Sequence, residues 1–331
     1  MTFPETDIRC FRESLGNGAR VLISTHIHPD ADAIGSVLAA AEMVTGLGGA
    51  PAILLDDDVP IRCRILPGAD NIISYPTGKP TERFRVGLIV DSGNLSRIGD
   101  VRDALEKDAV LFNVDHHLSN DSFGRVNFVD LQSASTTELL FSLCRELELP
   151  ITPSLADNMF AGLLSDTGRF RYANVTPASL HVAGELVAAG ARVTDITNAL
   201  YFDLSVQDVR SMSEIYSTLE IFGDGRISMM FVRLEYLVED PDCVVDLALS
   251  IRGVQTAALL SETRGDKIRV ALRSRDGVNV ARLAERFGGG GHAKAAGFRM
   301  CGTLESVRER LLPELLRAVG VGETTAALTE A

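Results

Sequence analysis

Residues 21–49 read VLISTHIHPDADAIGSVLAAAEMVTGLGG, and this stretch decides the expected fold. Its first four residues form a short apolar run that is typical of a buried strand. Residues 33–47 are rich in alanine, with apolar side chains at helical spacing, and Gly48 and Gly49 end that helix. A buried strand that passes through a polar loop into a helix is the repeating unit of a parallel α/β sheet.

The same alternation of strands and helices continues through the first half of the chain. Further strands are expected at 52–55, 86–90 and 110–114, and further helices at 136–147, at 154–164 and from Thr176-Pro177 to near Gly190. We therefore expect an N-terminal α/β domain over residues 1–195, with a parallel sheet and flanking helices. Residues 193–219 look helical without a fixed partner in the pattern. Residues 196–219 are therefore expected to form a helical linker.

The pattern of predicted elements changes near residue 220, in the second half of the chain. Asp224-Gly225 and Gly265-Asp266 each lie between two β-rich runs, as the turn of a β-hairpin does. Other elements expected here are a turn at Asp276-Gly277, a short helix at 280–287 and a C-terminal helix at 304–319. The pattern predicts a smaller C-terminal α/β domain with a mixed sheet over residues 220–322, followed by a tail at 323–331.

Composition limits the classes of partner. A chain of 331 residues is long enough for two domains, and 46% hydrophobic residues can build a core. The net charge of −13 argues against a coat of duplex DNA and against an anionic membrane surface. Only four of the 32 basic residues are lysine, so arginine dominates. Arginine is the better bidentate phosphate binder, although a GC-rich genome would give the same excess.

No targeting signal is visible in the sequence. The N-terminus lacks a basic start followed by an apolar stretch, and no apolar run reaches the roughly 18 residues of a membrane span. The five cysteines lie far apart without a CxxC pair, so they fit neither a disulfide framework nor a zinc knuckle. We expect buried thiols in a cytoplasmic protein that is not attached to a membrane.

Potential metal ligands follow three of the expected strands. The first strand leads into His26-Ile27-His28-Pro29-Asp30-Ala31-Asp32, the strand at 86–90 ends on Asp91, and the strand at 110–114 ends on Asp115-His116-His117. Asp166 follows an apolar helix. Because the carboxyl ends of parallel strands meet at one edge of a sheet, these side chains can converge. Carboxylates crowded together there would repel one another without a cation, so the pattern predicts a pair of divalent ions.

Each piece of this pattern also has a purely structural interpretation. A lone aspartate after a strand is often a helix cap, and a pair of histidines can be structural. The concentration of histidine favours the metal site, because four of the six, His26, His28, His116 and His117, fall in two short segments directly after strands. Carboxylates with imidazoles suit Mn²⁺ better than metals that prefer thiolates, and Co²⁺, Mg²⁺ or Zn²⁺ are the alternatives.

A run of four glycines, Gly288 to Gly291, marks the second domain. Glycines before a helix let backbone N–H groups approach an anion closely, and the alternative is a flexible linker. Residues 262–299 hold nine basic and four acidic residues, against the acidic balance of the whole chain. Arg273, Arg275 and Lys294 flank the glycines. We therefore expect an electropositive cleft that faces the acidic metal edge and takes a phosphoester.

These motifs resemble those of the DHH phosphoesterase superfamily, over nearly the whole chain. The matching segments are His26 to Ser36 for the first motif, Asp91 to Arg97 for the second, Asp115-His116-His117 for the signature triplet, Ser165 to Phe170 for the fourth, and Gly288 to Phe298 for the GGGGH loop of the DHH-associated domain. With only these two domains, the chain is most similar to the NrnA-type subfamily of oligoribonucleases and phosphatases of 3′-phosphoadenosine 5′-phosphate (pAp). His28 stands where that motif commonly carries Asn, which leaves its role open.

The resemblance implies a site for two metal ions, most often manganese. His26 and Asp30 would hold one ion, and Asp32, His116 and Asp166 would hold the other. Asp91 would bridge the two ions. Asp115 would orient the neighbouring imidazoles.

The resemblance also implies how a phosphoester is bound and cleaved. A metal-activated hydroxide would attack the phosphorus. Asp91 would take part in catalysis by binding both ions. His117, with Arg97 as a weaker candidate, would stabilise charge on the phosphate oxygens. The residues that would grip the nucleotide or its terminal phosphate are Arg273, Ser274, Gly289, Gly290, Gly291 and His292.

The implied activity is hydrolysis of very short RNA to mononucleotides and of pAp to AMP, by a homodimer that associates through its first domain. The alternatives are a phosphodiesterase of cyclic dinucleotides or of linear dinucleotides such as pApA and pGpG, an exopolyphosphatase or pyrophosphatase, and a silent nucleotide-binding module. The glycine loop with Arg273-Ser274 favours a nucleotide over polyphosphate. Every ligand position of the family is filled, which argues against a silent module.

Overall fold

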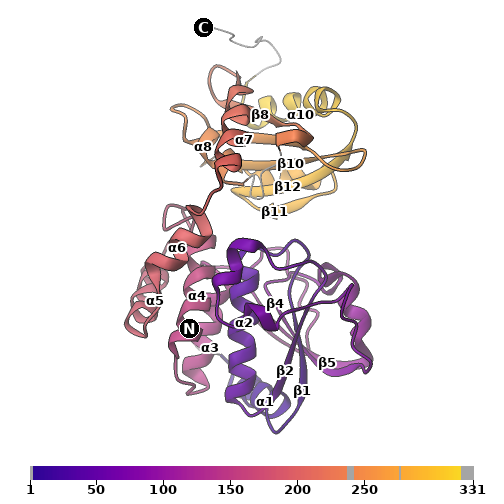
Figure 1. Ribbon diagram of the computed structural model, residues 1–331, viewed down its shortest axis with the longest axis vertical. Helices are drawn as coiled ribbons and strands as arrows, with labels where there is room; N and C mark the ends of the chain where they lie inside the picture. Colours follow the sequence, from indigo (N-terminus) through magenta and orange to yellow (C-terminus); the bar gives the residue numbers. More distant parts are fainter. Residues whose placement is uncertain (1–2, 237–241, 276, 322–331) are drawn as a thin grey trace. The chain divides into compact units, whose positions relative to one another are not determined.

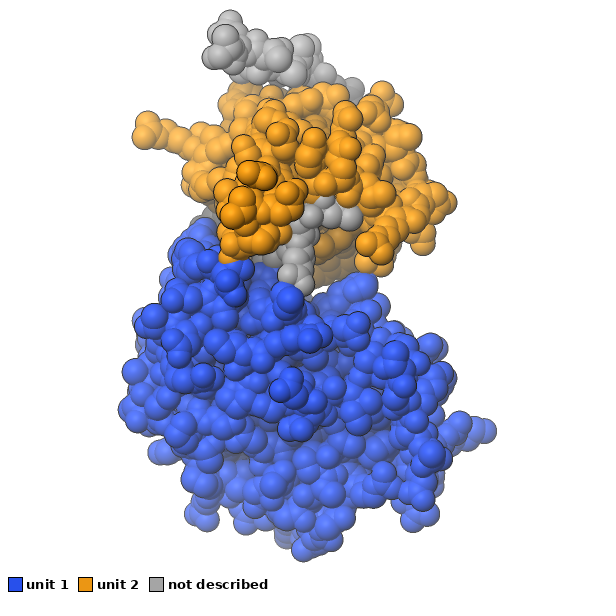
Figure 2. All heavy atoms as spheres, viewed as in Figure 1, with its two compact units in different colours: residues 1–203 blue, residues 204–331 orange. Residues whose placement is uncertain are grey.

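The computed structural model describes residues 3–236, 242–275 and 277–321 (Figure 1). The chain divides into two compact units, residues 1–203 and residues 204–331 (Figure 2). Each unit is built around its own six-stranded sheet. The expected tail at 323–331 and Asp276 of the expected turn lie outside the described residues.

The sheet of the first unit is wholly parallel, which confirms the prediction from the α/β alternation. Its strands lie in the order β3-β2-β1-β4-β5-β6. Their bounds are Arg20–Ser24 (β1), Ala50–Leu55 (β2), Ile73–Ser74 (β3), Phe84–Val90 (β4), Leu105–Asp115 (β5) and Val126–Val129 (β6). The short edge strands β3 and β6 were not expected from the sequence. Because β1, β4 and β5 are neighbours, the three strand ends that carry the predicted ligands meet at one edge.

Two hydrophobic cores cover the two faces of this sheet. The helices are α1 (Glu5–Leu15), α2 (Ala31–Gly46), α3 (Thr136–Glu146), α4 (Pro153–Asp166), α5 (Pro177–Ala188) and α6 (Val193–Tyr201), and the longest 3₁₀ segment is η3 (Leu95–Ala104). Val21 and Ile23 of β1 pack into the core formed with the α-helices, whereas Leu22 between them packs into the core that contains η3. This alternation fixes the register of the strand, since successive side chains of a strand point to opposite faces.

The sheet of the second unit is mixed, as the hairpin signals predicted. Its strands lie in the order β11-β12-β10-β9-β8-β7, and only β8 and β9 pair in parallel. The strands are β7 (Glu220–Phe222), β8 (Ile227–Val232), β9 (Thr256–Glu262), β10 (Lys267–Ser274), β11 (Gly290–His292) and β12 (Ala295–Cys301). The helices are α7 (Val206–Ser217), α8 (Asp242–Ser250), α9 (Val280–Glu285) and α10 (Leu304–Ala318). One core includes α7 and α8, and the other includes α9 and α10.

Several local expectations need correction. The glycine run leads into the strand β11, which contains Gly290 and Gly291, and not into a helix. The helical stretch at 193–219 consists of two helices, α6 in the first unit and α7 in the second. The helix α8 was not expected. Cys63 and Cys144 are buried as expected, but Cys10 is half-buried and Cys301 is exposed. No described helix is both long and apolar enough to cross a membrane.

Candidate metal centre

The edge at which β1, β4 and β5 end carries a cluster of buried imidazoles and carboxylates. Asp91 directly follows β4 and is 2% exposed. Its Oδ2 lies 3.4 Å from Nε2 of His26, and its Oδ1 lies 3.7 Å from Nε2 of His116. Asp91 therefore presents one oxygen to each imidazole, which is how a carboxylate that bridges two ions is placed.

The hydrogen bonds of the two imidazoles define which nitrogen faces the cluster. Nδ1 of His26 lies 2.8 Å from the carbonyl oxygen of Ile27, and Nδ1 of His116 lies 3.2 Å from that of Ser133. A carbonyl only accepts, so in each ring Nδ1 carries the proton and donates it. A neutral imidazole held in this way presents Nε2 as a metal ligand, so the donor set fits divalent ions.

Two further carboxylates come from the first turn of α2. Oδ1 of Asp30 caps this helix and accepts from the backbone N–H groups of Asp32 and Ala33, both at 3.0 Å. Asp32 itself is fully buried. From the last residue of α4, Oδ2 of Asp166 lies 3.1 Å from Nε2 of His116. Three elements thus bring carboxylates to the two imidazoles.

Among the described residues, several groups of possible ligand atoms overlap, and two of these groups match the predicted ligands. In one group, atoms of His26, Asp30 and Asp91 lie within 4.8 Å of one another, and in the other, atoms of Asp32, Asp91 and His116 do so. Asp91 belongs to both groups, and Asp166 joins the second through its contact with His116. One ion in each group would have Asp91 between them.

Burial and crowding shift the pKa values of these ligands. Burial raises the pKa of Asp32, and nearby Asp166 and Asp91 raise it further. Burial also raises the pKa of Asp166, to about 6. For Asp91 burial acts in the same direction, but the imidazoles outweigh it and hold the pKa well below its usual range.

The pKa values of the two histidines rise instead of falling. Burial alone would lower the pKa of His26, but Asp91 and then Asp30 outweigh it and raise the pKa to about 8. Asp166 and Asp91 likewise raise the pKa of His116 against the effect of burial. Without cations, protons thus occupy the positions where metal ions would bind, so metal binding releases protons.

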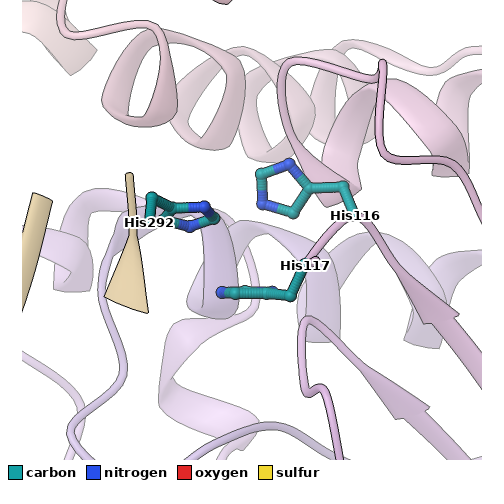
Figure 3. Close-up of side chains that lie close together, drawn as sticks. All are labelled: His116, His117 and His292. Atoms are coloured by element: carbon teal, nitrogen blue, oxygen red, sulfur yellow. The ribbon is translucent and has the colours of Figure 1, made fainter. Parts of the chain in front are cut away.

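A buried chain of hydrogen bonds orients His117, whose ring lies beside that of His116 (Figure 3). Nδ1 of His117 lies 2.6 Å from Oδ1 of Asp115, which is fully buried. The other oxygen of Asp115 accepts from Nδ2 of Asn120 at 2.6 Å, and the same amide group donates to Oδ1 of Asn113 at 2.8 Å. Nδ1 of His117 is therefore directed at Asp115, and this contact fixes the orientation of the ring.

Arg97, which belongs to η3, and His28, in the loop that follows β1, lie next to His26. The carbonyl oxygen of Arg97 accepts the N–H of Ile27 at 2.7 Å, and the guanidinium of Arg97 opposes the rise in the pKa of His26. His28 has a φ of +56°, and its N–H donates to Oδ2 of Asp57 at 2.5 Å. Its ring nitrogen Nδ1 lies 3.1 Å from the same oxygen. His28 thus contacts Asp57 and belongs to neither group of ligands.

Reasoning from the sequence missed three residues that hold the predicted ligands. Thr136 and Thr137, at the start of α3, donate hydrogen bonds to Asp91 and Asp32. Asn120 donates to Asp115. The predicted helix at 136–147 already places a helix N-terminus here, and Ser135 and Glu138 match the S-x-x-E pattern of a helix start. Nothing in the sequence indicates which carboxylates that N-terminus meets.

In the second unit, two of the predicted substrate ligands make contacts of their own. Arg273 on β10 has a side chain that is 14% exposed, and its Nε lies 3.3 Å from Oδ1 of Asp246. Ser274 is 6% exposed. Its hydroxyl donates to the carbonyl oxygen of Val278 at 2.7 Å, so its proton holds the turn that follows β10.

The glycines of the loop differ in what they allow. A Cβ on Gly289 would lie 2.1 Å from the carbonyl oxygen of Gly297, and one on Gly291 would lie 2.5 Å from that of Ala295. A Cβ on Gly290 would meet no described atom within 4 Å, and Gly290 does not have a positive φ. Packing therefore explains Gly289 and Gly291, whereas nothing in the described fold requires a glycine at position 290.

Comparisons with known proteins match both units. The DHH family, N-terminal domain, matches residues 20–163, and the DHHA1 domain matches residues 240–320. The bifunctional oligoribonuclease and PAP phosphatase NrnA of Thermus thermophilus is 32% identical over 88% of this chain and 90% of its own length. The protein of the same name from Bacillus subtilis is 26% identical over 84% and 88%.

A solved structure has the same fold over nearly its whole length. The exopolyphosphatase-related protein of Bacteroides fragilis superposes with a TM-score of 0.87 and 25% identity, over 95% of this chain and 96% of that one. Both units are thus matched together, and in the same order, in relatives of similar length.

Proposed function

The chain belongs to the DHH family, and on this premise we propose that it is a metal-dependent phosphoesterase that hydrolyses very short oligoribonucleotides to mononucleotides and pAp to AMP. The observation that carries the proposal is the cluster at the ends of β1, β4 and β5, in which two groups of ligands, buried except for the exposed Asp30, share Asp91. The names of the curated relatives, oligoribonuclease and PAP phosphatase, support this class of substrate.

The cluster would hold two divalent ions. In the proposal, His26 and Asp30 bind one ion, Asp32, His116 and Asp166 bind the other, and Asp91 lies between them. Bound ions supply a nucleophilic water at neutral pH and stabilise charge on the phosphoryl oxygens. Oxygen and imidazole ligands without thiolate suit Mn²⁺, which is therefore the ion that we propose.

The residues around the cluster would bind and orient the phosphate. His117 contacts a phosphate oxygen through Nε2, because its contact with Asp115 directs Nδ1 away from the ligand. Asp115, with Asn120 behind it, holds the ring in that orientation. Arg97 is the second candidate for stabilising the phosphate charge, since its positive charge acts to lower the pKa of His26.

The second unit would grip the nucleotide. The proposed contacts are the backbone N–H groups of the glycine loop, with Gly289, Gly290 and Gly291, together with His292, Arg273 and Ser274. The contact of Arg273 with Asp246 would hold the guanidinium in one orientation. Ser274 would act by holding its turn, since its proton is already donated to Val278. We also propose that the protein is cytoplasmic and forms a homodimer.

Replacement of Asp91 tests the proposal. Asp91→Ala removes the carboxylate shared by both groups of ligands, so we expect loss of hydrolysis by at least about 10²-fold for both pAp and a 5′-labelled RNA dinucleotide in buffer with Mn²⁺. The matched control is Asp195→Ala, which removes an exposed carboxylate from α6 and should keep wild-type rates. Circular dichroism would check the fold of both variants. Wild-type turnover by folded Asp91→Ala would disprove the two-metal mechanism.

A further inference from the structure

One residue at the start of α3 contacts two carboxylates of the centre. The backbone N–H of Thr136 donates to Oδ2 of Asp32 at 2.8 Å, and the hydroxyl of Thr136 donates to Oδ1 of Asp91 at 2.8 Å. Both donors belong to the first helical residue of α3, so their spacing is restricted by the helix backbone and by one rotamer. Thr136 therefore restricts how far apart the two carboxylates can lie.

The next residue contacts the other oxygen of Asp32. The N–H and the hydroxyl of Thr137 donate to Oδ1 of Asp32, at 3.2 and 2.9 Å. The hydroxyl of Ser135 lies 2.8 Å from that of Thr137 and accepts the N–H of Glu138 as the cap of α3. Because the proton of Thr137 goes to the carboxylate, Ser135 must be the donor to Thr137. The hydroxyl of Ser135 thus donates to that of Thr137, and the hydroxyl of Thr137 donates to Asp32.

These bonds leave Asp32 one position for an ion. A carboxylate oxygen has about two acceptor sites, and both sites of Oδ1 are taken by Thr137. Oδ2 accepts only the N–H of Thr136, so one of its sites stays available. Asp32 can therefore bind an ion through Oδ2 alone.

A neighbouring helix closes the other side of Asp32. Gly162 of α4 packs so tightly here that a Cβ on it would lie 2.3 Å from Oδ1 of Asp32 and 2.6 Å from the hydroxyl oxygen of Thr137. No ion can approach Oδ1 from the side of α4, because the helix backbone occupies that space. This packing is independent of the hydrogen bonds and points to the same mode of coordination.

We propose that Thr136 and Thr137 are positioning residues that restrict Asp32 to binding a metal ion through one oxygen and set its separation from Asp91. The inference rests on the proposed metal centre. It also has a consequence for the choice of ion. Ca²⁺ takes six to eight oxygens and often binds carboxylates through both of them, whereas smaller octahedral ions accept a single oxygen. The threonine pair would therefore disfavour Ca²⁺ at this position.

Isosteric variants test this proposal by their metal affinity, without any substrate. Thr136→Val and Thr137→Val each remove a hydroxyl and keep the backbone donor, and the corresponding Ser variants restore the hydroxyl. We expect Mn²⁺ affinity, measured by electron paramagnetic resonance of the free ion, to fall about 10-fold in the Val variants and to recover in the Ser variants. In Thr137→Val, competition with Ca²⁺ should also show weaker discrimination against Ca²⁺.

The matched control is Thr152→Val, which removes the hydroxyl that caps α4 and accepts the N–H of Leu155 at 3.0 Å. It should lower the unfolding temperature and keep wild-type Mn²⁺ affinity. Where valine at position 136 or 137 prevents folding, Thr→Ala at the same position serves as the second variant. Val or Ala variants that bind Mn²⁺ and Ca²⁺ like the wild type would overturn the inference. A wild type that binds Mn²⁺ but hydrolyses neither pAp nor dinucleotides would instead overturn the proposed function.

Discussion

At the scale of single residues, Asp91 has both an unusual backbone and an unusual environment. Its φ of +52° is left-handed, a conformation that costs a non-glycine residue of order 1 kcal/mol. Its N–H donates to the carbonyl oxygen of Val114 on β5, and its side chain accepts the hydroxyl of Thr136. These contacts hold the strained residue, and the strain turns its carboxylate toward the imidazoles that follow β1 and β5.

His26 makes the stability of the metal-free protein depend on pH. Its pKa is about 8 in the folded protein and about 6.5 when unfolded, so the folded state binds the proton more tightly. The resulting stabilisation is fully present below pH 6.5 and is lost as the pH rises through 8. We expect the free energy of unfolding to fall by up to about 2 kcal/mol over that window in EDTA.

Denaturant unfolding between pH 6 and 9 measures this effect. His26→Asn should reduce the fall, and the part that remains belongs to His116, whose pKa is raised as well. Saturating Mn²⁺ should abolish the fall, because an ion needs the unprotonated imidazole. A metal-free protein whose stability is constant, or rises, between pH 6.5 and 8.5 would contradict the expectation.

Asn120 is expected to affect turnover more than binding. Asn120→Ala removes the donor to Asp115 and thereby frees the carboxylate that orients His117. We expect kcat for pAp to fall about 10-fold, with KM and Mn²⁺ affinity near their wild-type values. Asn127→Ala is the matched control, since Asn127 holds the same loop through Gly124 and does not contact Asp115. Equal losses of kcat in the two variants would indicate general disorder of the loop instead.

The sequence predicted residues that the structure brings together in the candidate site, but not the residues that hold them. His26, Asp91 and His116 each follow a short apolar run, and a strand end is a local signal. The threonines of α3 gain their function only from where the helix N-terminus lies, which depends on packing among α2, α3 and α4. Such contacts between distant segments leave no periodic signal in the chain.

At the scale of elements, packing requires a glycine at positions 289 and 291 of the glycine run but not at position 290, although Gly290 and Gly291 both belong to β11. We expect Gly289→Ala to lower the unfolding temperature, because its Cβ would overlap the carbonyl oxygen of Gly297. Gly290→Ala should keep the wild-type unfolding temperature, because its Cβ enters open space, and should raise KM for pAp several-fold if that space takes the ligand. Thermal unfolding and steady-state kinetics on both variants give the two readouts. Unchanged KM in Gly290→Ala would remove this position from the substrate site.

Two of the elements that were not predicted, α8 and β11, are formed by tertiary contacts. The helix α8 contains Val244 and Val245 near its start, and β-branched residues have low helix propensity. Its helical form instead lets Val244, Val245 and Ala248 enter one core with strand residues such as Leu259. The strand β11 likewise consists mostly of glycine, and pairing with β12 makes it a strand. The long elements with strong periodicity, α2, α4 and α10, were all predicted.

At the scale of the whole molecule, the charges that sum to −13 are unevenly distributed along the chain. Four of the acidic residues, Asp30, Asp32, Asp91 and Asp166, lie in the candidate centre, where two divalent ions would balance their charge. Residues 262–299 carry an excess of five basic residues. The acidic total thus excludes a general coat of nucleic acid and is compatible with one short, phosphate-rich ligand.

The two units should also unfold separately, because each has its own cores. Mn²⁺ at about 100 times its Kd should stabilise the first unit by about 2.7 kcal/mol for each of the two proposed ions and leave the second unit unchanged. Conversely, Leu311→Ala removes a fully buried side chain of α10 and should destabilise only the second unit, by about 2–5 kcal/mol. Differential scanning calorimetry of the wild type and the variant, each with and without Mn²⁺, would resolve the two transitions. A single transition that moves with both the ion and the substitution would mean that the chain unfolds as one cooperative body.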